Sequence, residues 1–317
     1  MNIQTEQQPI KKPHIWAIGG GKGGVGKSVV SILIALALAR NGQKTVLVDA
    51  DLGGANLHTM MGIKTPARTL NDFLTKKYEN IEDICIRTQV KNLELICGAS
   101  EILSLANPIF AQKTKIVQSV TSMAADHVIL DLGAGTSYNV IDFFLIADSP
   151  VVVLTPQPIS IQNAYGFVRN TMYRKLSRMA SQHPSLQEVI KTAMNPKNDH
   201  KMRTIADLFE AIRKTHGVKA VKQLTEAIAK IKPMLITNMA KTDRDANASR
   251  IIQLVAEKYL MMDAYQVGVI ERDLLIEEMI SKMKPISDLP KYCRSYVSAE
   301  AIVQRRLGQV LKPLFQR

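Results

Sequence analysis

The sequence is poor in cysteine and has no long apolar run. Its three cysteines, Cys85, Cys97 and Cys293, lie far apart without a C-x-x-C spacing, which excludes a disulfide framework and a four-cysteine zinc site. The longest apolar run, Val29 to Ala39, is too short for a membrane-spanning helix of about 20 residues. The first 12 residues lack the charged-then-apolar order of a signal peptide. These absences predict a cytoplasmic protein with reduced thiols.

Internal repeats and low-complexity segments are also missing. The 317 residues, of which 46% are hydrophobic, are therefore expected to form one large α/β domain, or a nucleotide domain that carries an insertion. Basic residues outnumber acidic ones, and the formal net charge is +13. Residues 169–232 hold 14 lysines and arginines against 5 acids, and residues 291–317 hold 6 against 1. Two segments therefore carry the basicity, which suggests an anionic partner.

Short apolar runs alternate with helical patterns in the first half of the chain, which is typical of βαβ units on a parallel sheet. The first helix is predicted over Lys27 to Asn41. The predicted strands, each short, aliphatic and bounded by turn residues, are His14–Ile18, Thr45–Val48, Leu93–Ile96, His127–Leu130, Val151–Thr155, Met234–Thr237 and an edge strand, Tyr265–Val269. The pattern predicts an α/β fold with a doubly wound, mostly parallel sheet.

A glycine-rich segment separates the first predicted strand from the first predicted helix. Residues 21–28, GKGGVGKS, match G-x-x-x-x-G-K-[ST] in the strand–helix context that a P-loop requires. Backbone N–H groups of such a loop surround phosphate oxygens, Lys27 reaches the β- and γ-phosphates, and the Ser28 hydroxyl ligates Mg²⁺. The residues expected to bind the nucleotide are Gly21, Gly23, Gly24, Val25, Gly26, Lys27, Ser28 and Val29.

The same glycines fit a second motif. Gly21, Gly23 and Gly26 satisfy G-x-G-x-x-G, and Asp49 ends the second strand about 20 residues on, as in a dinucleotide-binding fold. Lys27 and the serine after it argue against this alternative, because a dinucleotide-binding helix needs neither a cation nor a metal ligand there. Acids at two strand ends, together with that hydroxyl, instead suit a Mg²⁺-bound triphosphate.

Lys22 is not required by an ordinary P-loop. The segment GGGKGGVGKS, residues 19–28, resembles the deviant Walker A motif of the MinD/ParA ATPases. In that family the additional lysine crosses a dimer interface and contacts the phosphates that the partner binds. The resemblance therefore implies an ATP hydrolase with ATP and Mg²⁺ as its ligands, and a homodimer with ATP in which Lys22 stabilises the triphosphate of the other subunit.

Two carboxylates, Asp49 and Asp51, follow the second predicted strand, at the end where open α/β sheets bind ligands. The resemblance implies that this segment is switch I. Asp51 then aligns the attacking water as a catalytic residue beside Lys22 and Lys27, Asp49 orients the Mg²⁺ shell, and Asn56 supports the switch. The alternative is that both acids cap backbone N–H groups at the end of the strand.

Another acid, Asp131, ends a third apolar strand and precedes Gly133 and Gly135. This is the shape of a Walker B strand and switch II. Asp131 is therefore expected to bind Mg²⁺ together with the P-loop serine and Asp49, and the glycines give freedom to a loop that senses the γ-phosphate. At a later strand end, Asn238 resembles the position where the family contacts adenine, and a turn asparagine is the alternative.

The remaining patterns divide the chain. Helical periodicity dominates residues 164–229, with polar breaks at 183–184 and 195–200, and further helices are predicted over 249–260 and 298–315. We expect a flexible tail (1–13), a P-loop ATPase domain (14–168 and 231–290), a basic helical insertion (169–230) and a basic amphipathic C-terminal helix (291–317). The insertion is expected either to bind DNA or to be a solvated face. The C-terminal helix is expected either to bind an anionic membrane or to pack on the sheet.

Longer stretches resemble one branch of the family, the FlhG/FleN ATPases that set flagellar number and position. They are DADLGGANLHTMMGI, TLNDFL, ICGAS and, most specifically, residues 131–169 beginning DLGAG. The resemblance implies an ATP-dependent switch with a protein partner, a flagellar GTPase or assembly component, in the cytoplasm or at the inner face of the membrane. The N-terminus lacks the branch's Asp-Gln motif and the insertion is long. A ParA-like DNA-partition ATPase, a MinD-like positioning ATPase and a metabolic enzyme of the same fold therefore stay open.

Overall fold

The computed structural model describes residues 12–98, 110–195 and 204–308, and the strands in these ranges form one sheet. The strands are β1 (His14–Gly19), β2 (Thr45–Ala50), β3 (Ile86–Arg87), β4 (Leu93–Ile96), β5 (His127–Leu132), β6 (Ser149–Leu154), β7 (Met234–Ala240) and β8 (Tyr265–Glu271). Their order is β3-β4-β2-β5-β1-β6-β7-β8, and every pair is parallel except β3–β4. The predicted mostly parallel sheet and its edge strand β8 are confirmed.

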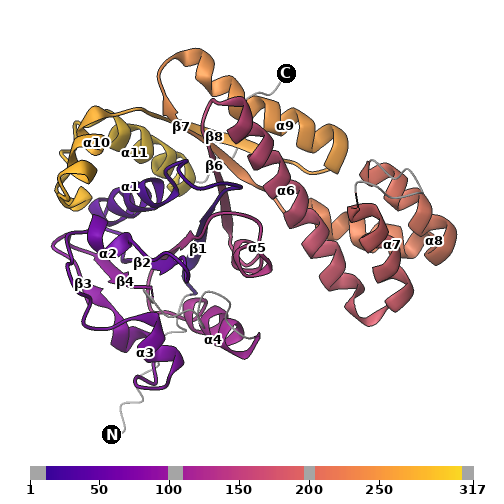
Figure 1. Cartoon of the computed structure of the whole chain (residues 1–317), viewed down its shortest axis with the longest axis horizontal. Helices are drawn as coiled ribbons and strands as arrows, with labels where there is room; N and C mark the ends of the chain where they lie inside the picture. Colours follow the sequence, from indigo (N-terminus) through magenta and orange to yellow (C-terminus); the bar gives the residue numbers. More distant parts are fainter. Residues whose placement is uncertain (1–11, 99–109, 196–203, 309–317) are drawn as a thin grey trace, which may run out of the picture.

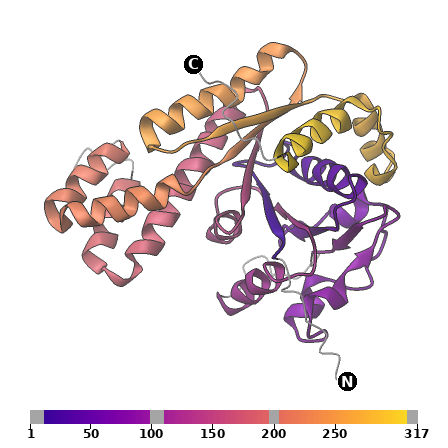
Figure 2. The same cartoon turned by 180° about the vertical axis from the view of Figure 1, so that it is seen from behind.

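Helices cover both faces of the sheet (Figure 1). One face carries α1 (Lys27–Arg40), α2 (Leu57–Met60), α10 (Leu274–Ser281) and α11 (Arg294–Leu307). The other carries α3 (Leu70–Leu74), α4 (Phe110–Val120), α5 (Tyr138–Phe144), α6 (Pro158–Met179) and α9 (Asn247–Leu260). The two remaining helices, α7 (Pro184–Met194) and α8 (Ile205–Ala229), pack on α6 and project beyond the sheet (Figure 2).

Helix α1 carries apolar side chains on all sides from Val30 to Ala39, apart from Ser31, because protein surrounds it. Every residue from Val30 to Ala39 is buried between the sheet and α11. Along β1, Trp16 packs on this side of the sheet, whereas its neighbour Ala17 packs on the other, as the two-residue period of a strand requires. At the end of α1, the Arg40 guanidinium lies 4.7 Å from the centre of the Tyr296 ring of α11. The sheet and α11 thus hold α1, the helix that follows the glycine-rich loop, in a fixed position.

The C-terminal helix differs from the prediction. It begins at Arg294 rather than at Ser298, and its described part ends at Leu307. Ile302 and Val303 are buried against α1 and β8, so this part of the helix packs on the sheet, as the alternative expected. Residues 309–317, which carry the last part of the predicted basic amphipathic pattern, lie outside the described residues. In the ranges that the structure covers, no helix is both long and apolar enough to cross a membrane.

The segment between β6 and β7 is helical, as predicted, and the break between α6 and α7 covers residues 180–183, directly before the first residue of α7. Helix α6 runs from Pro158 to Met179 without interruption, so the domain boundary expected at residues 168–169 falls inside a helix. Helix α8 is kinked at Gly217, whose φ of 79° and ψ of 175° are not helical. Most of the expected tail (residues 1–11 of 1–13) and of the second polar break (residues 196–200 of 195–200) lies outside the described residues.

Candidate functional site: the glycine-rich loop and the strand ends

The loop between β1 and α1 has the backbone of an anion cradle. Gly24 and Gly26 adopt left-handed φ values of 79° and 84°, a region that other residues rarely occupy. Gly23 and Gly24 are exposed, and a Cβ on Gly24 meets nothing within 4 Å. The loop therefore leaves open space beside backbone N–H groups at the N-terminus of a 14-residue helix, where a negative charge is favoured.

Two glycines of this loop are required by protein packing. A Cβ on Gly21 would overlap the backbone carbonyl of Asn163 in α6, and a Cβ on Gly26 would overlap the amide of Asn238. The Asn238 side chain is buried and its amide nitrogen donates a 2.9 Å hydrogen bond to the Val25 carbonyl inside the loop. Helix α6 and the end of β7 thus hold the loop in shape. The adenine contact expected of Asn238 stays a prediction, since its amide here binds protein.

The two lysines of the loop lie in different surroundings. Lys27 is only 8% exposed. Burial lowers its pKa, while the nearby charges of Asp131 and Asp51 act in the opposite direction. Lys22, in contrast, is exposed. One lysine is therefore built into the site, and the other is available to a molecule outside it.

Asp131 stands at the end of β5, beside the loop, and is almost fully buried. Its Oδ1 accepts a 2.9 Å hydrogen bond from the Ser31 hydroxyl, and the Ser28 hydroxyl lies close enough to the carboxylate to act as a second donor. Burial raises the pKa of Asp131 to about 6, although these hydrogen bonds and the charge of Lys27 oppose the rise. The structure therefore brings Lys27, Ser28 and Asp131 together, as the motifs predict, and adds Ser31, which sequence reasoning missed.

Asp49 lies opposite Asp131 in the register of β2 and β5, and it too is almost fully buried. Burial and the nearby charges of Asp131 and Asp51 raise its pKa to about 7, against the hydrogen bonds that it accepts. Those bonds come from the N–H groups of Leu57 (3.0 Å) and Asp51 (3.3 Å), one to each carboxylate oxygen. Asp49 thus makes the backbone caps considered as its alternative, and its Mg²⁺ role stays a prediction.

Asp51 connects the two loops that follow β2 and β5. Its Oδ1 accepts a 3.4 Å hydrogen bond from the N–H of Gly53, and a Cβ on Gly133 would lie only 2.9 Å from the same oxygen. The carboxylate therefore rests directly against the backbone at Gly133. Asn56 does not support Asp51 through a bond described here; its amide donates to the Gly54 carbonyl at 2.8 Å within its own loop.

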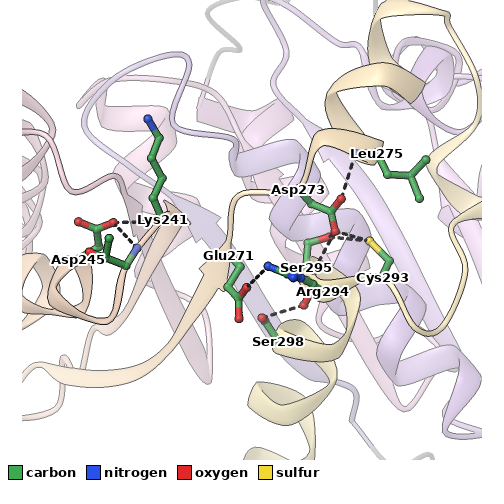
Figure 3. Close-up of polar contacts among 10 residues, drawn as sticks. Lys241, Asp245, Glu271, Asp273, Leu275, Cys293, Arg294, Ser295 and Ser298 are labelled. Carbon is green, nitrogen blue, oxygen red and sulfur yellow. Dashed lines mark hydrogen bonds and ion pairs between the residues drawn. The ribbon is translucent and has the colours of Figure 1, made fainter.

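A pocket of about 440 Å³ lies near the carboxyl ends of β7 and β8, beyond Asn238. Its lining residues are Ala240, Lys241, Thr242, Asp243, Ala246, Val269 and Glu271. Asp245 accepts hydrogen bonds from the N–H groups of Lys241 (2.7 Å) and Thr242 (3.0 Å), while the Lys241 side chain extends away from it (Figure 3). The place and size of the pocket suit the base of a nucleotide. Of the residues near this pocket, only Asn238 is predicted from the sequence, although the predicted ends of β7 and β8 could have indicated the pocket.

The residues present fit a magnesium-bound triphosphate. The cradle is open, Lys27 supplies a cation, and Ser28 and Asp131 place side-chain oxygens beside it. In the part of the chain that the structure describes, no group of three or more His, Cys, Asp or Glu side chains is placed to hold a metal ion. Few protein ligands are what Mg²⁺ needs when water and substrate phosphates complete its shell.

This parallel sheet, with a glycine-rich loop before its first helix and acids at the neighbouring strand ends, defines a P-loop NTPase. A family model described as "ParA: NUBPL iron-transfer P-loop NTPase" matches residues 11–179, more than half of the chain. The chain belongs to the ParA/MinD family of P-loop NTPases.

Named relatives include an antiactivator and a flagellum site-determining protein. The antiactivator FleN of Pseudomonas aeruginosa is 33% identical over 176 residues, which cover 53% of this chain and 62% of FleN. The flagellum site-determining protein YlxH of Helicobacter pylori is 34% identical over 155 residues, which cover 48% of this chain and 52% of YlxH. The chain thus matches less than two thirds of each relative. The septum site-determining protein MinD of Pyrococcus horikoshii, solved with Mg-ADP, shares the fold, with a TM-score of 0.62 and 20% identity over 94% of this chain and 98% of that one.

Proposed function

We propose that the chain is an ATP hydrolase that works as a dimerisation switch. Lys27 binds the phosphates of the chain's own nucleotide, and Lys22 enters the site of a second copy. The observation that carries this proposal is the contrast on one loop between Lys27, which is 8% exposed, and Lys22, which faces solvent. Ser28, Asp131 and Asp49 hold Mg²⁺, which neutralises phosphate charge when it is bound.

Apolar side chains around the loop support contact with a second protein surface. Tyr138, Ile159 and Met239 are 61%, 62% and 39% exposed. Tyr138 opens the helix that follows the Asp131 loop, and Ile159 lies one helical turn before the carbonyl that abuts Gly21. The Met239 methyl group lies 3.4 Å from the Cβ position of Gly26. Phosphates cannot cover such groups favourably, whereas a second copy of the chain can.

Asp51 controls ATP hydrolysis, which ends the dimeric state of the switch. We place it against the attacking water, which it orients, while Lys22 of the other copy and Lys27 stabilise charge on the phosphates. Because Asp51 rests against Gly133, the loops after β2 and β5 are in contact and respond together. Loss of the γ-phosphate then releases both loops and the two copies separate.

The cargo that we propose is the flagellum, with control of its number or placement. The support is the similarity to the antiactivator FleN and to YlxH, which is named a flagellum site-determining protein, together with the DLGAG segment. The proposal includes a protein partner, a flagellar GTPase or assembly component, and action in the cytoplasm or at the inner face of the membrane. A MinD-like division-site role uses the same switch and is the alternative for the cargo.

The test is the oligomeric state, measured by light scattering during size-exclusion chromatography. We expect Asp51→Ala to be a dimer with saturating ATP and a monomer with ADP, since it binds ATP without hydrolysing it. Lys22→Ala should stay monomeric in both, while Lys91→Ala, which removes an exposed lysine outside the loop, should behave as wild type. An Asp51→Ala chain that remains monomeric with saturating ATP would contradict the switch.

A second candidate function is ParA-like binding of DNA through the basic insertion. Exposed lysines lie in the part of α8 after its kink at Gly217 and just beyond the end of the helix. None of them forms a salt bridge with another described residue. They are Lys219, Lys222, Lys230 and Lys232. Lysines of this kind hold phosphates without reading sequence. ATP-dependent retention of DNA that falls as salt rises would support this function, and no retention at about 50 mM salt would remove it.

A further inference from the structure

Ser31 carries a hydroxyl group in the buried stretch Val30–Ala39 of α1, where every other residue is apolar. It is fully buried, and the residues that follow it in α1, up to Ala39, are Ile, Leu and Ala. A buried hydroxyl is costly unless it forms a hydrogen bond, and alanine would avoid the cost in a helix. The hydroxyl therefore has a partner that matters.

Two acceptors lie within reach of the Ser31 hydroxyl, which has only one proton. The Lys27 carbonyl, one turn earlier, is 3.0 Å away, and Oδ1 of Asp131 is 2.9 Å away. Bonding to the preceding turn is common for helical serines and explains nothing about the site. A carboxylate is the stronger acceptor. We propose that Ser31 is a positioning residue that orients Asp131 for Mg²⁺ binding.

The geometry separates the role of Ser31 in orienting the Asp131 carboxylate from that of Ser28. Ser28 and Ser31 lie three residues apart on one face of α1, and both reach Asp131. Ser28 also serves as a Mg²⁺ ligand in the proposed function, on which this inference rests, whereas Ser31 has no other task. The strand pairings of β5 with β1 and β2 hold the Asp131 backbone, so the two hydroxyls determine the direction of its carboxylate.

The experiment titrates Mg²⁺ against the binding of a fluorescent ATP analogue. Loss of a residue that orients a metal-binding group lowers metal affinity about 10- to 100-fold, so the half-saturating Mg²⁺ concentration of Ser31→Ala should rise by at least about tenfold. The affinity for the analogue in EDTA should stay unchanged, because the loop and Lys27 are intact. Ser31→Thr, which keeps the hydroxyl, should remain close to wild type.

Ser295→Ala is the matched control. Ser295 is also a buried helical serine, and its hydroxyl lies 3.4 Å from Oδ2 of Asp273, far from the loop in the sequence (Figure 3). Both variants lose a serine–aspartate contact, but only Ser31→Ala should change the Mg²⁺ dependence. An equal Mg²⁺ dependence in Ser31→Ala and wild type would overturn the inference alone. A wild-type chain that binds no analogue with Mg²⁺ would overturn the proposed function and this inference with it.

Discussion

Replacing Gly133 by alanine tests whether the position of Asp51 controls hydrolysis. Gly133 does not have a left-handed φ, so alanine brings no backbone strain, and the atoms nearest to the new Cβ belong to the Asp51 carboxylate. The new Cβ would lie 2.9 Å from Oδ1, whereas ordinary contact begins at 3.4 Å. The carboxylate must therefore move by about 0.5 Å. Because a misplacement of about 1 Å can cost 10²-fold in rate, we expect kcat to fall about tenfold.

The assay for Gly133→Ala compares steady-state ATP hydrolysis with the binding of a fluorescent ATP analogue. Affinity should change little, because the glycine-rich loop and Lys27 are untouched. Gly166→Ala is the control, since a Cβ there meets nothing within 4 Å and alanine favours the helix by about 1 kcal/mol. Hydrolysis by Gly133→Ala at the wild-type rate would refute a catalytic role for the observed Asp51 position.

Two further variants test the packing behind the site. Asp142 accepts two 2.8 Å hydrogen bonds from Arg174 and an ion pair from Lys113; burial alone would raise its pKa, but these partners hold it below its usual value. A carboxylate whose pKa is lowered by folding stabilises the folded state at pH values above its unfolded pKa. In urea unfolding at pH 7, the free energy of unfolding of Asp142→Asn should therefore be lower than that of wild type by on the order of 3 kcal/mol, and the two values should converge only below about pH 4. Convergence near pH 6 would contradict the lowered pKa. Asn238→Ala removes the hydrogen-bond donor of the Val25 carbonyl, which should destabilise the fold by about 1–3 kcal/mol. It should also weaken ATP-analogue binding about tenfold. Unchanged affinity would show that this hydrogen bond does not shape the loop.

Much of the fold follows from contiguous patterns. The buried parallel strands and the first helix could be predicted because each is encoded by its own residues. Strand β3 was missed since it is two residues long and exists only by pairing with β4. Helix α11 begins earlier than its apolar pattern because Asp273 accepts a hydrogen bond from the N–H of Ser295, a cap supplied from 22 residues away. No local pattern contains such a partner.

The candidate site divides in the same way. Motif spacing alone predicts that Lys27, Ser28 and Asp131 lie together, because the loop and the strand ends have a fixed spatial relation in this fold. Ser31 and Asn238 act through side-chain contacts across 100 and 213 residues of sequence, which spacing cannot predict. Asp49 shows the limit of a motif: a strand-end acid can cap backbone N–H groups as well as face a metal ion.

Mixing two inactive variants tests most directly whether Lys22 works in the site of a second copy. Lys22→Ala keeps its own Asp51 but offers no lysine to a partner, while Asp51→Ala offers Lys22 but cannot align water. In a mixed dimer, the site on the Lys22→Ala chain has every group, because the other chain supplies the lysine. We predict that each variant alone hydrolyses ATP poorly and that the mixture recovers part of the wild-type rate. A mixture no more active than its components would contradict the shared site.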